Sequence, residues 1–159
     1  MQKIARRAVL LGALLLAACV QVPPPNAFGA LEPTLPPPAP GAVRLYFYRL
    51  LEPYELPTGT IVYLNGQAVG YSRNGTVIYR DVAPGTYEVS VLSRGAYPYQ
   101  FKTITVQPGQ VWFMRIESLL SLTCGGLPGA ACPDAIFVVN IVDPAQARTE
   151  IAPLALVGG

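Results

Sequence analysis

The sequence predicts an all-β protein, an antiparallel β-sandwich with one short helix near its C-terminus. Short runs rich in Val, Ile, Thr, Tyr and Phe recur from residue 42 onward. Turn signals separate these runs, among them Asn65-Gly66, Asn74-Gly75 and Pro108-Gly109. Short strands at a spacing of roughly 8–12 residues, divided by such turns, are typical of sandwiches and barrels. Asn-Gly also supplies the positive φ angles that a type I′ hairpin turn needs.

The first expected strand is Val43–Arg49, where aliphatic and aromatic residues alternate with Arg and Tyr. This period of two places Arg44, Tyr46 and Tyr48 on one face of the strand, which we expect to face solvent. Six more strands are expected between the turns: Thr60–Leu64, Gln67–Tyr71, Thr76–Asp81, Thr86–Leu92, Gln100–Val106 and Val111–Ser118.

Two of these strands carry further information. In Thr86–Leu92, the alternation predicts that Tyr87, Val89 and Val91 face the core. The run Val111–Ile116 is apolar on both faces, which favours a central position in a sheet.

The C-terminal part predicts one more strand, one helix and a short end segment. Ala135–Val142 is the most hydrophobic of the expected strands. Asp143-Pro144 is typical of a helix N-cap followed by proline at the first helical position, so we expect a helix over Ala145–Ile151. Leu154–Gly159 then forms either an edge strand or a frayed end.

The N-terminus indicates export. Lys3, Arg6 and Arg7 precede an apolar run from Ala8 to Ala18. The run is far shorter than the roughly 20 residues that cross a bilayer as a helix, and the pattern is that of a signal peptide. The general secretory route is favoured, although the paired arginines leave a twin-arginine route open.

The residues before Cys19 resemble the lipobox of bacterial lipoprotein precursors. They read Leu16-Ala17-Ala18-Cys19. The resemblance implies that residues 1–18 are a lipoprotein signal peptide and that Cys19 is lipidated and anchors the protein to the membrane. Val20 follows, rather than an Asp that would retain the protein at the inner membrane. The implied location is therefore the outer membrane, facing the periplasm.

Residues 19–41 are expected to form the lipidated Cys and a proline-rich tether, and residues 42–159 the β-sandwich domain. Eight prolines lie between Val20 and Pro40. Proline fixes φ and removes a hydrogen-bond donor, so we expect no helix in this segment. An extended tether of roughly 20 residues reaches about 60 Å at ~3.1 Å per residue.

Composition limits the possible functions. The full chain has a formal net charge of +2, but removal of the signal peptide leaves 8 of the 11 basic residues against 9 acidic ones. No basic surface then argues for nucleic acid as a partner. The chain has no histidine, the commonest general base and metal ligand. We therefore expect no enzymatic activity, no metal and no cofactor.

Cys124 and Cys132 are the cysteines that remain once Cys19 is lipidated. In an exported protein such a pair favours a disulfide. Free thiols are the alternative, and a catalytic or metal-binding role is the least favoured one.

Several turn motifs resemble those of PEGA-type domains. They are Pro57-Thr58-Gly59-Thr60 followed by a strand and Asn65-Gly66, then Ala83-Pro84-Gly85-Thr86-Tyr87, and then Val106-Gln107-Pro108-Gly109. The whole stretch from Ala42 to Ile151 is also similar to small uncharacterised bacterial lipoproteins with a domain of unknown function. These resemblances imply a sandwich like transthyretin or the carboxypeptidase regulatory domain. They provide no catalytic residue to carry over.

Tyrosine is the strongest candidate for binding, because it joins an apolar ring to a polar hydroxyl. We expect a contact surface at Arg44, Tyr46 and Tyr48, or at Tyr97 and Tyr99 in the loop before residue 100. The alternative is that aromatic residues simply favour strands. The favoured function is a non-enzymatic module that binds an envelope protein or a cell-wall polymer. A small-ligand or saccharide-binding protein is the second hypothesis, and a hydrolase using two carboxylates is the third.

Overall fold

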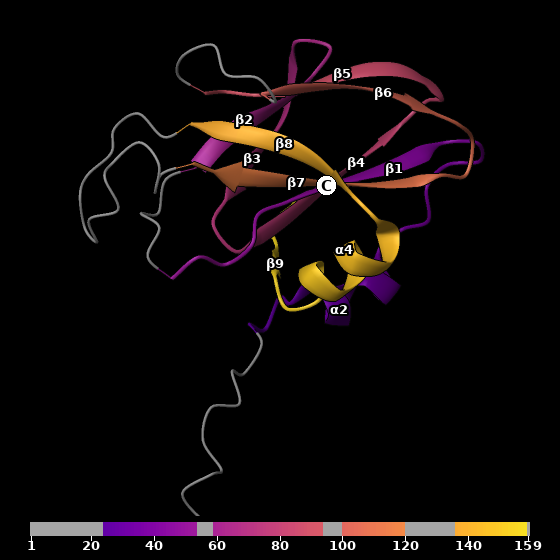
Figure 1. The fold of residues 1–159 in the computed structure, drawn as a ribbon. Coiled ribbons are helices and arrows are strands. Elements are labelled where there is room, and N and C mark those ends of the chain that lie inside the picture. Colours follow the sequence, from indigo (N-terminus) through magenta and orange to yellow (C-terminus); the bar gives the residue numbers. More distant parts are fainter. Residues whose placement is uncertain (1–23, 54–58, 94–99, 120–135, 159) are drawn as a thin grey trace, which may run out of the picture.

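The computed structural model describes residues 24–53, 59–93, 100–119 and 136–158. Their strands form two stacked sheets (Figure 1), which confirms the predicted all-β sandwich. One sheet has five strands in the order β8-β7-β1-β4-β9, and the other has four in the order β3-β2-β5-β6. The elements are α2 (Phe28–Leu31), the 3-10 turn η1 (Glu32–Thr34), β1 (Val43–Tyr48), β2 (Gly59–Leu64), β3 (Gln67–Arg73), β4 (Thr76–Val82), β5 (Gly85–Val91), β6 (Phe101–Val106), β7 (Val111–Ser118), β8 (Phe137–Val142), α4 (Pro144–Ile151) and β9 (Ala155–Leu156).

The two Asn-Gly pairs behave differently. Asn65 and Gly66 have φ angles of 49° and 76°, as a type I′ turn requires, and they join β2 to β3 in one hairpin. At Asn74-Gly75 only the glycine has a positive φ, 72°. This turn passes the chain from β3 in one sheet to β4 in the other, so it links the layers instead of closing a hairpin.

The five-stranded sheet is mixed, which corrects the expectation of a purely antiparallel sandwich. β1 pairs with β4 in antiparallel register but with β7 in parallel register. β9 also pairs with β4 in parallel. Of the two alternatives predicted for the C-terminal segment, an edge strand or a frayed end, the structure therefore shows the edge strand. Parallel neighbours need a crossover connection, and the chain supplies one by passing through the four-stranded sheet between β4 and β7.

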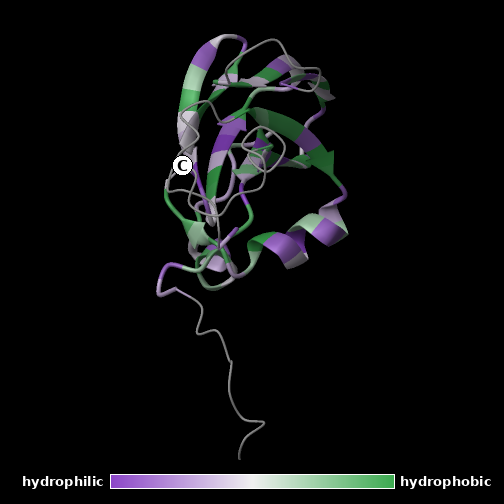
Figure 2. Ribbon diagram, turned by 60° about the vertical axis from the view of Figure 1, so that its left-hand side comes forward, coloured by the Kyte–Doolittle hydropathy of each residue, from purple (hydrophilic) through white to green (hydrophobic). Residues whose placement is uncertain are grey.

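The main core lies between the two sheets. Val43, Leu45 and Phe47 point into it from β1, and Val89 and Val91 from β5, as the alternation predicts. β7 lies between β8 and β1, which confirms the interior position expected from its apolar faces. Figure 2 shows the resulting alternation of hydrophobic and hydrophilic bands along the strands.

A second apolar cluster lies on the other side of the five-stranded sheet. Figure 1 shows α2 and α4 beneath this sheet, on the side away from β5 and β6. The cluster joins residues from both chain ends to the outer face of β1 and β7: Phe28, Tyr46, Tyr48, Val77, Phe113, Val142, Ala147, Ile151 and Leu154. The protein therefore has three layers, and β1 is buried on both faces.

The expectation of no helix between residues 20 and 40 is wrong. α2 and η1 form there, and Phe28 is buried in the second cluster. The Phe28 amide donates a hydrogen bond of 2.7 Å to the carbonyl oxygen of Leu154. The physical reason is that residues 27–31 contain no proline and are apolar, so they can form a helical turn that packs on the sheet. Pro33 occupies an early position of η1, where its missing N–H is not needed.

The C-terminal helix begins as predicted. Asp143 is its N-cap, and its Oδ1 accepts hydrogen bonds from the amides of Ala145 at 2.9 Å and Gln146 at 3.4 Å. Ala147 and Ile151, four residues apart, are the buried residues of α4. This spacing places one apolar stripe against the sheet. None of the helices in the described part of the chain has the length and apolar character that crossing a membrane would require.

Candidate functional site

The predicted contact surface on β1 is wrong, because its three residues are buried. Arg44, Tyr46 and Tyr48 are only 5%, 3% and 0% exposed. The alternation correctly places them on one face of the strand, but α2 and α4 cover that face. They belong to the packing between the sheet and its covering layer.

Tyr46 is the centre of an aromatic group. Its ring stacks on Phe113 with centroids 5.2 Å apart, and Phe28 meets it edge-on, also at 5.2 Å. Tyr79 lies at 6.2 Å in a tilted arrangement. Such aromatic pairs stabilise by about 0.5–1.5 kcal/mol beyond the area they bury. Tyr46 thus holds α2 to the sheet.

Arg44 makes a second connection to the N-terminal segment. Its Nε and Nη2 atoms donate to the two carboxylate oxygens of Asp81, each at 2.7 Å. Nη2 also donates to the carbonyl oxygen of Pro36 at 2.7 Å. The hydrogen bonds to Asp81 raise the pKa of Arg44 above its ordinary value. The guanidinium therefore stays charged, and its charge is used within the fold.

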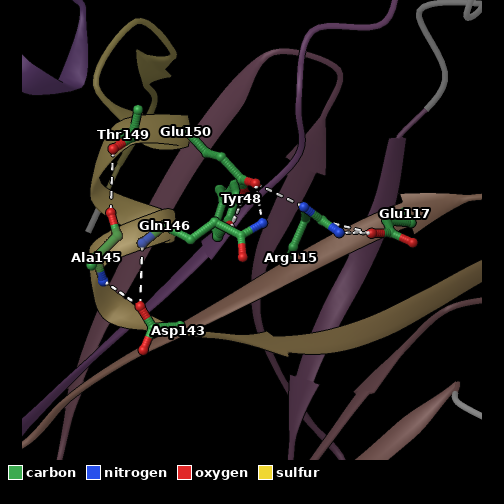
Figure 3. Close-up of polar contacts among 8 residues, drawn as sticks. All are labelled: Tyr48, Arg115, Glu117, Asp143, Ala145, Gln146, Thr149 and Glu150. Atoms are coloured by element: carbon green, nitrogen blue, oxygen red, sulfur yellow. Dashed lines mark hydrogen bonds and ion pairs between the residues drawn. The ribbon is translucent and has the colours of Figure 1, made fainter.

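Tyr48 belongs to a polar network that attaches α4 to the sheet (Figure 3). Its hydroxyl donates to Glu150 Oε2 at 2.6 Å, and Arg115 Nη1 donates to Glu150 Oε1 at 2.9 Å. Gln146 adds a hydrogen bond to the same Oε1 at 2.7 Å. Arg115 Nε also donates to Glu117 at 2.6 Å. The network brings two carboxylates, from β7 and α4, to one guanidinium.

The protonation of this network favours a structural role over acid catalysis. Burial raises the pKa of Glu150, but the hydrogen bonds from Tyr48 and Gln146 and the charge of Arg115 outweigh it, so the pKa is lowered overall. A catalytic acid needs the opposite, a carboxyl pKa raised toward the working pH. Burial and the bond to Glu150 raise the pKa of Tyr48, so its hydroxyl remains a donor.

Replacing Glu150 with glutamine is expected to lower the free energy of unfolding by about 1–2 kcal/mol near neutral pH. The reason is that the hydrogen bonds from Tyr48, Arg115 and Gln146 would no longer be accepted by a charged carboxylate. A lowered carboxyl pKa stabilises the fold above the unfolded pKa of about 4.3, and this contribution disappears as pH falls through the folded pKa. The variant and wild type should therefore converge in acid. Urea denaturation from pH 7 to pH 2.5 measures this. Glu52→Gln, at an exposed glutamate, is the control, and a difference that persists undiminished in acid would contradict the assignment.

The remaining predicted sites lie outside the described residues. These are Tyr97 and Tyr99 of the second expected contact surface, Cys19, and the expected disulfide partners Cys124 and Cys132. Within the described ranges, no group of three His, Cys, Asp or Glu side chains is placed to hold a metal ion.

The outer face of the four-stranded sheet carries an aromatic surface that the sequence reasoning missed. In the strand register, Tyr63 lies opposite Ser90, Ser90 lies opposite Phe101, and Ile61 lies opposite Tyr71. Directly opposed residues share a face, and this face points away from the core formed by Val62, Val89 and Val91. We call the surface formed by Ile61, Tyr63, Tyr71, Leu92 and Phe101 the open face.

The open face exposes large side chains. Tyr71, Leu92 and Phe101 are 45%, 55% and 59% exposed, and Ile61 and Tyr63 are half-buried. Contiguous exposed apolar groups mark interaction surfaces on soluble domains. In β6, exposed Phe101, Thr103 and Thr105 alternate with buried Ile104 and Val106. An aromatic residue among the polar residues of one strand face was therefore the sequence signal that could have predicted the open face.

A cavity of about 270 Å³ lies at one edge of the sandwich, where β3 of one sheet meets β4 of the other. Arg73 and Arg80 line it, together with Tyr71, Ile78 and the chain after β9 at Val157 and Gly158. The Arg73 guanidinium carbon lies 5.4 Å from the centroid of the Tyr71 ring. The cavity therefore joins two cationic groups to an exposed aromatic ring.

Comparison with protein families gives one finding. A model described as "Protein of unknown function (DUF2846)" matches residues 40–127, which is more than half of the chain and includes β1 to β7. α2, η1, β8, α4 and β9 lie outside the match, so the layer over β1 is built from residues beyond it. No curated protein matches the chain.

Proposed function

Because the chain belongs to DUF2846, a family of unknown function, we propose its role from its own geometry. It is a membrane-anchored, non-enzymatic module that binds a partner of the bacterial envelope through the open face. The observation that carries the proposal is the difference between the two outer faces of the sandwich. α2 and α4 cover the outer face of the five-stranded sheet, whereas the open face leaves Tyr71, Leu92 and Phe101 exposed.

The anchor is proposed from the sequence. The Leu16–Cys19 motif resembles a lipobox, and the location that this implies is the outer membrane, facing the periplasm. Several acyl chains on Cys19 would hold the protein stably, since each buried methylene contributes about 0.8 kcal/mol.

The chemistry of the open face fits a protein partner. Aromatic side chains on a broad sheet supply large contact area, and Tyr and Phe are enriched in the cores of protein interfaces. Serine and threonine surround them at Ser90, Thr103 and Thr105, which resembles the polar rim of an interface. A cell-wall polymer is the alternative partner.

The test is crosslinking in whole cells followed by capture of the protein and its partner. We expect the double variant Leu92→Ser/Phe101→Ser to lose at least 90% of the captured partner, because these are the two most exposed large apolar side chains of the open face. Both are more than half exposed, so circular dichroism should show an intact fold. Cys19→Ala, in the same cells, should give an unprocessed precursor or a product that leaves the membrane fraction.

The matched control is Ile141→Ser, an exposed apolar residue on β8 of the other sheet. It should capture the partner as wild type does. Undiminished capture by the double variant would refute the open face as the contact, and normal maturation and membrane fractionation of Cys19→Ala would refute the anchor. Recovery of polysaccharide without protein would identify the polymer as the partner.

A further inference from the structure

We propose that the cavity between β3 and β4 binds an acidic sugar unit, a single sugar ring that carries a carboxylate. The site goes beyond the proposed function, because four of the residues that shape it, Gly70, Arg73, Ile78 and Arg80, are not part of the open face. Only Tyr71 belongs to both. The two proposals can therefore fail separately.

The backbone builds the cavity at a place where the two sheets approach each other. A β-carbon at Gly70 would collide with the Ile78 side chain, so glycine is what lets β3 pass this close to β4. On the far side, Gly158 has a φ of 147° and no atom within 4 Å of the place where a β-carbon would lie. Glycine at position 70 thus sets how closely the two strands approach, and the space beside Gly158 is open.

The charges of the cavity are not used within the described part of the fold. Arginines outside the cavity pair with carboxylates. Arg44 pairs with Asp81, and Arg148 pairs with Glu32. Arg115 pairs with both Glu117 and Glu150. Among the described residues, Arg73 and Arg80 pair with none. Arg80 uses Nη1 to donate to the carbonyl oxygen of Tyr79 at 3.0 Å, and a guanidinium has five N–H donors. Most donors of both groups remain available for a ligand.

Two guanidiniums beside one cavity select for an oxyanion. The planar fork of arginine matches the two oxygens of a carboxylate, and such charge-assisted pairs are stronger than neutral hydrogen bonds. Tyr71 is 45% exposed, with the Arg73 guanidinium beside its ring, so its ring edge and hydroxyl are available for apolar and polar contacts with a sugar. An anion with a ring attached satisfies both features.

The size of the cavity limits the ligand to one unit. Its volume of about 270 Å³ is below the range of roughly 300–1,000 Å³ that holds drug-sized ligands. A single sugar ring fits this space, whereas a longer chain must extend into solvent past the edge of β3. The ligand is thus either a free acidic sugar or one unit of an acidic polysaccharide.

The experiment is calorimetric titration of the mature protein, purified in detergent, with four probes. D-glucuronate tests the whole ligand, D-glucose lacks the carboxylate, inorganic phosphate lacks the ring, and a glucuronate-containing tetrasaccharide represents a polymer. We expect a dissociation constant of about 1 mM for glucuronate, given the small number of ligand atoms. Glucose and phosphate should each bind at least fivefold more weakly.

Variants assign the binding to the cavity. Arg73→Gln and Arg80→Gln should each weaken glucuronate binding at least fivefold, and Arg80→Lys should recover part of the loss because it keeps the charge without the fork. Arg148→Gln, which removes an arginine outside the cavity, should bind as wild type does. Circular dichroism checks the fold of each variant.

The outcomes separate the sources of the ligand and the two proposals. Tighter binding of the tetrasaccharide indicates a polymer unit, and equal binding indicates a free sugar. Glucose binding as strongly as glucuronate, phosphate binding as strongly as glucuronate, or unchanged binding by both glutamine variants would overturn the site. Leu92→Ser/Phe101→Ser should bind glucuronate normally, so a loss of partner capture in that variant leaves this proposal intact.

Discussion

Replacing Tyr46 and Tyr48 together with alanine is expected to abolish the folded state of the domain. Both side chains are almost completely buried. Tyr46 packs against Phe28 and Phe113. Removing a buried aromatic side chain costs about 3–5 kcal/mol. Two such losses approach the whole stability of a typical domain, about 5–15 kcal/mol. The second change also leaves Glu150 without the hydroxyl that bonds its Oε2.

Circular dichroism and thermal unfolding measure this directly. The double variant should lack a cooperative transition, and each single variant should unfold at a clearly lower temperature than wild type. Tyr71→Ala is the matched control, because Tyr71 is 45% exposed and its loss should leave the fold intact. A double variant that keeps its sheet signal and a cooperative transition would show that the covering layer contributes little to stability.

Phe28→Ala is expected to lower the free energy of unfolding by about 3–4 kcal/mol, although the residue lies in a proline-rich segment that the sequence predicts to be a tether. Phe28 is 1% exposed, and its ring meets Tyr46 edge-on. The reason for the large effect is that the segment forms part of the second apolar cluster.

Urea denaturation of the mature protein tests this, and the midpoint should fall while the slope of the transition stays unchanged. Pro37→Ala, at an exposed position of the same segment, should lower stability by no more than about 1 kcal/mol, through the greater freedom of the unfolded chain. If Phe28→Ala were as mild as Pro37→Ala, the segment would be a spacer after all.

The strands were predictable because each signal is local. β2 and β3 follow from the alternation of residues and from Asn65-Gly66, and α4 follows from Asp143-Pro144. Pairing across the sandwich is not local. Nothing in Val43–Tyr48 or Val111–Ser118 by itself shows that these strands run parallel, since that depends on the path through the other sheet.

The candidate surface on β1 failed for a related reason. Alternation identifies two faces of a strand, but it does not show whether another layer covers the polar one. Arg and Tyr are ordinary residues for a solvent-facing strand, and here Arg44 pairs with Asp81 while Tyr48 bonds to Glu150, 102 residues later in the chain. The apolar residues of the N-terminal segment were the overlooked signal, because Phe28 and Leu31 need a surface to pack against.

If Cys19 anchors the protein as proposed, the packing of residues 26–31 limits how far the domain can stand from the membrane. With a lipid on Cys19, Asn26 lies seven residues later, and it exchanges hydrogen bonds with Leu156 of the folded domain. Seven residues span at most about 25 Å, against the roughly 60 Å of a fully extended tether. The domain then stays close to the bilayer, although it can still rotate about its attachment. The open face lies on the opposite side of the sandwich from α2, so its partners in the crosslinking experiment should be envelope molecules within reach of a domain held near the membrane.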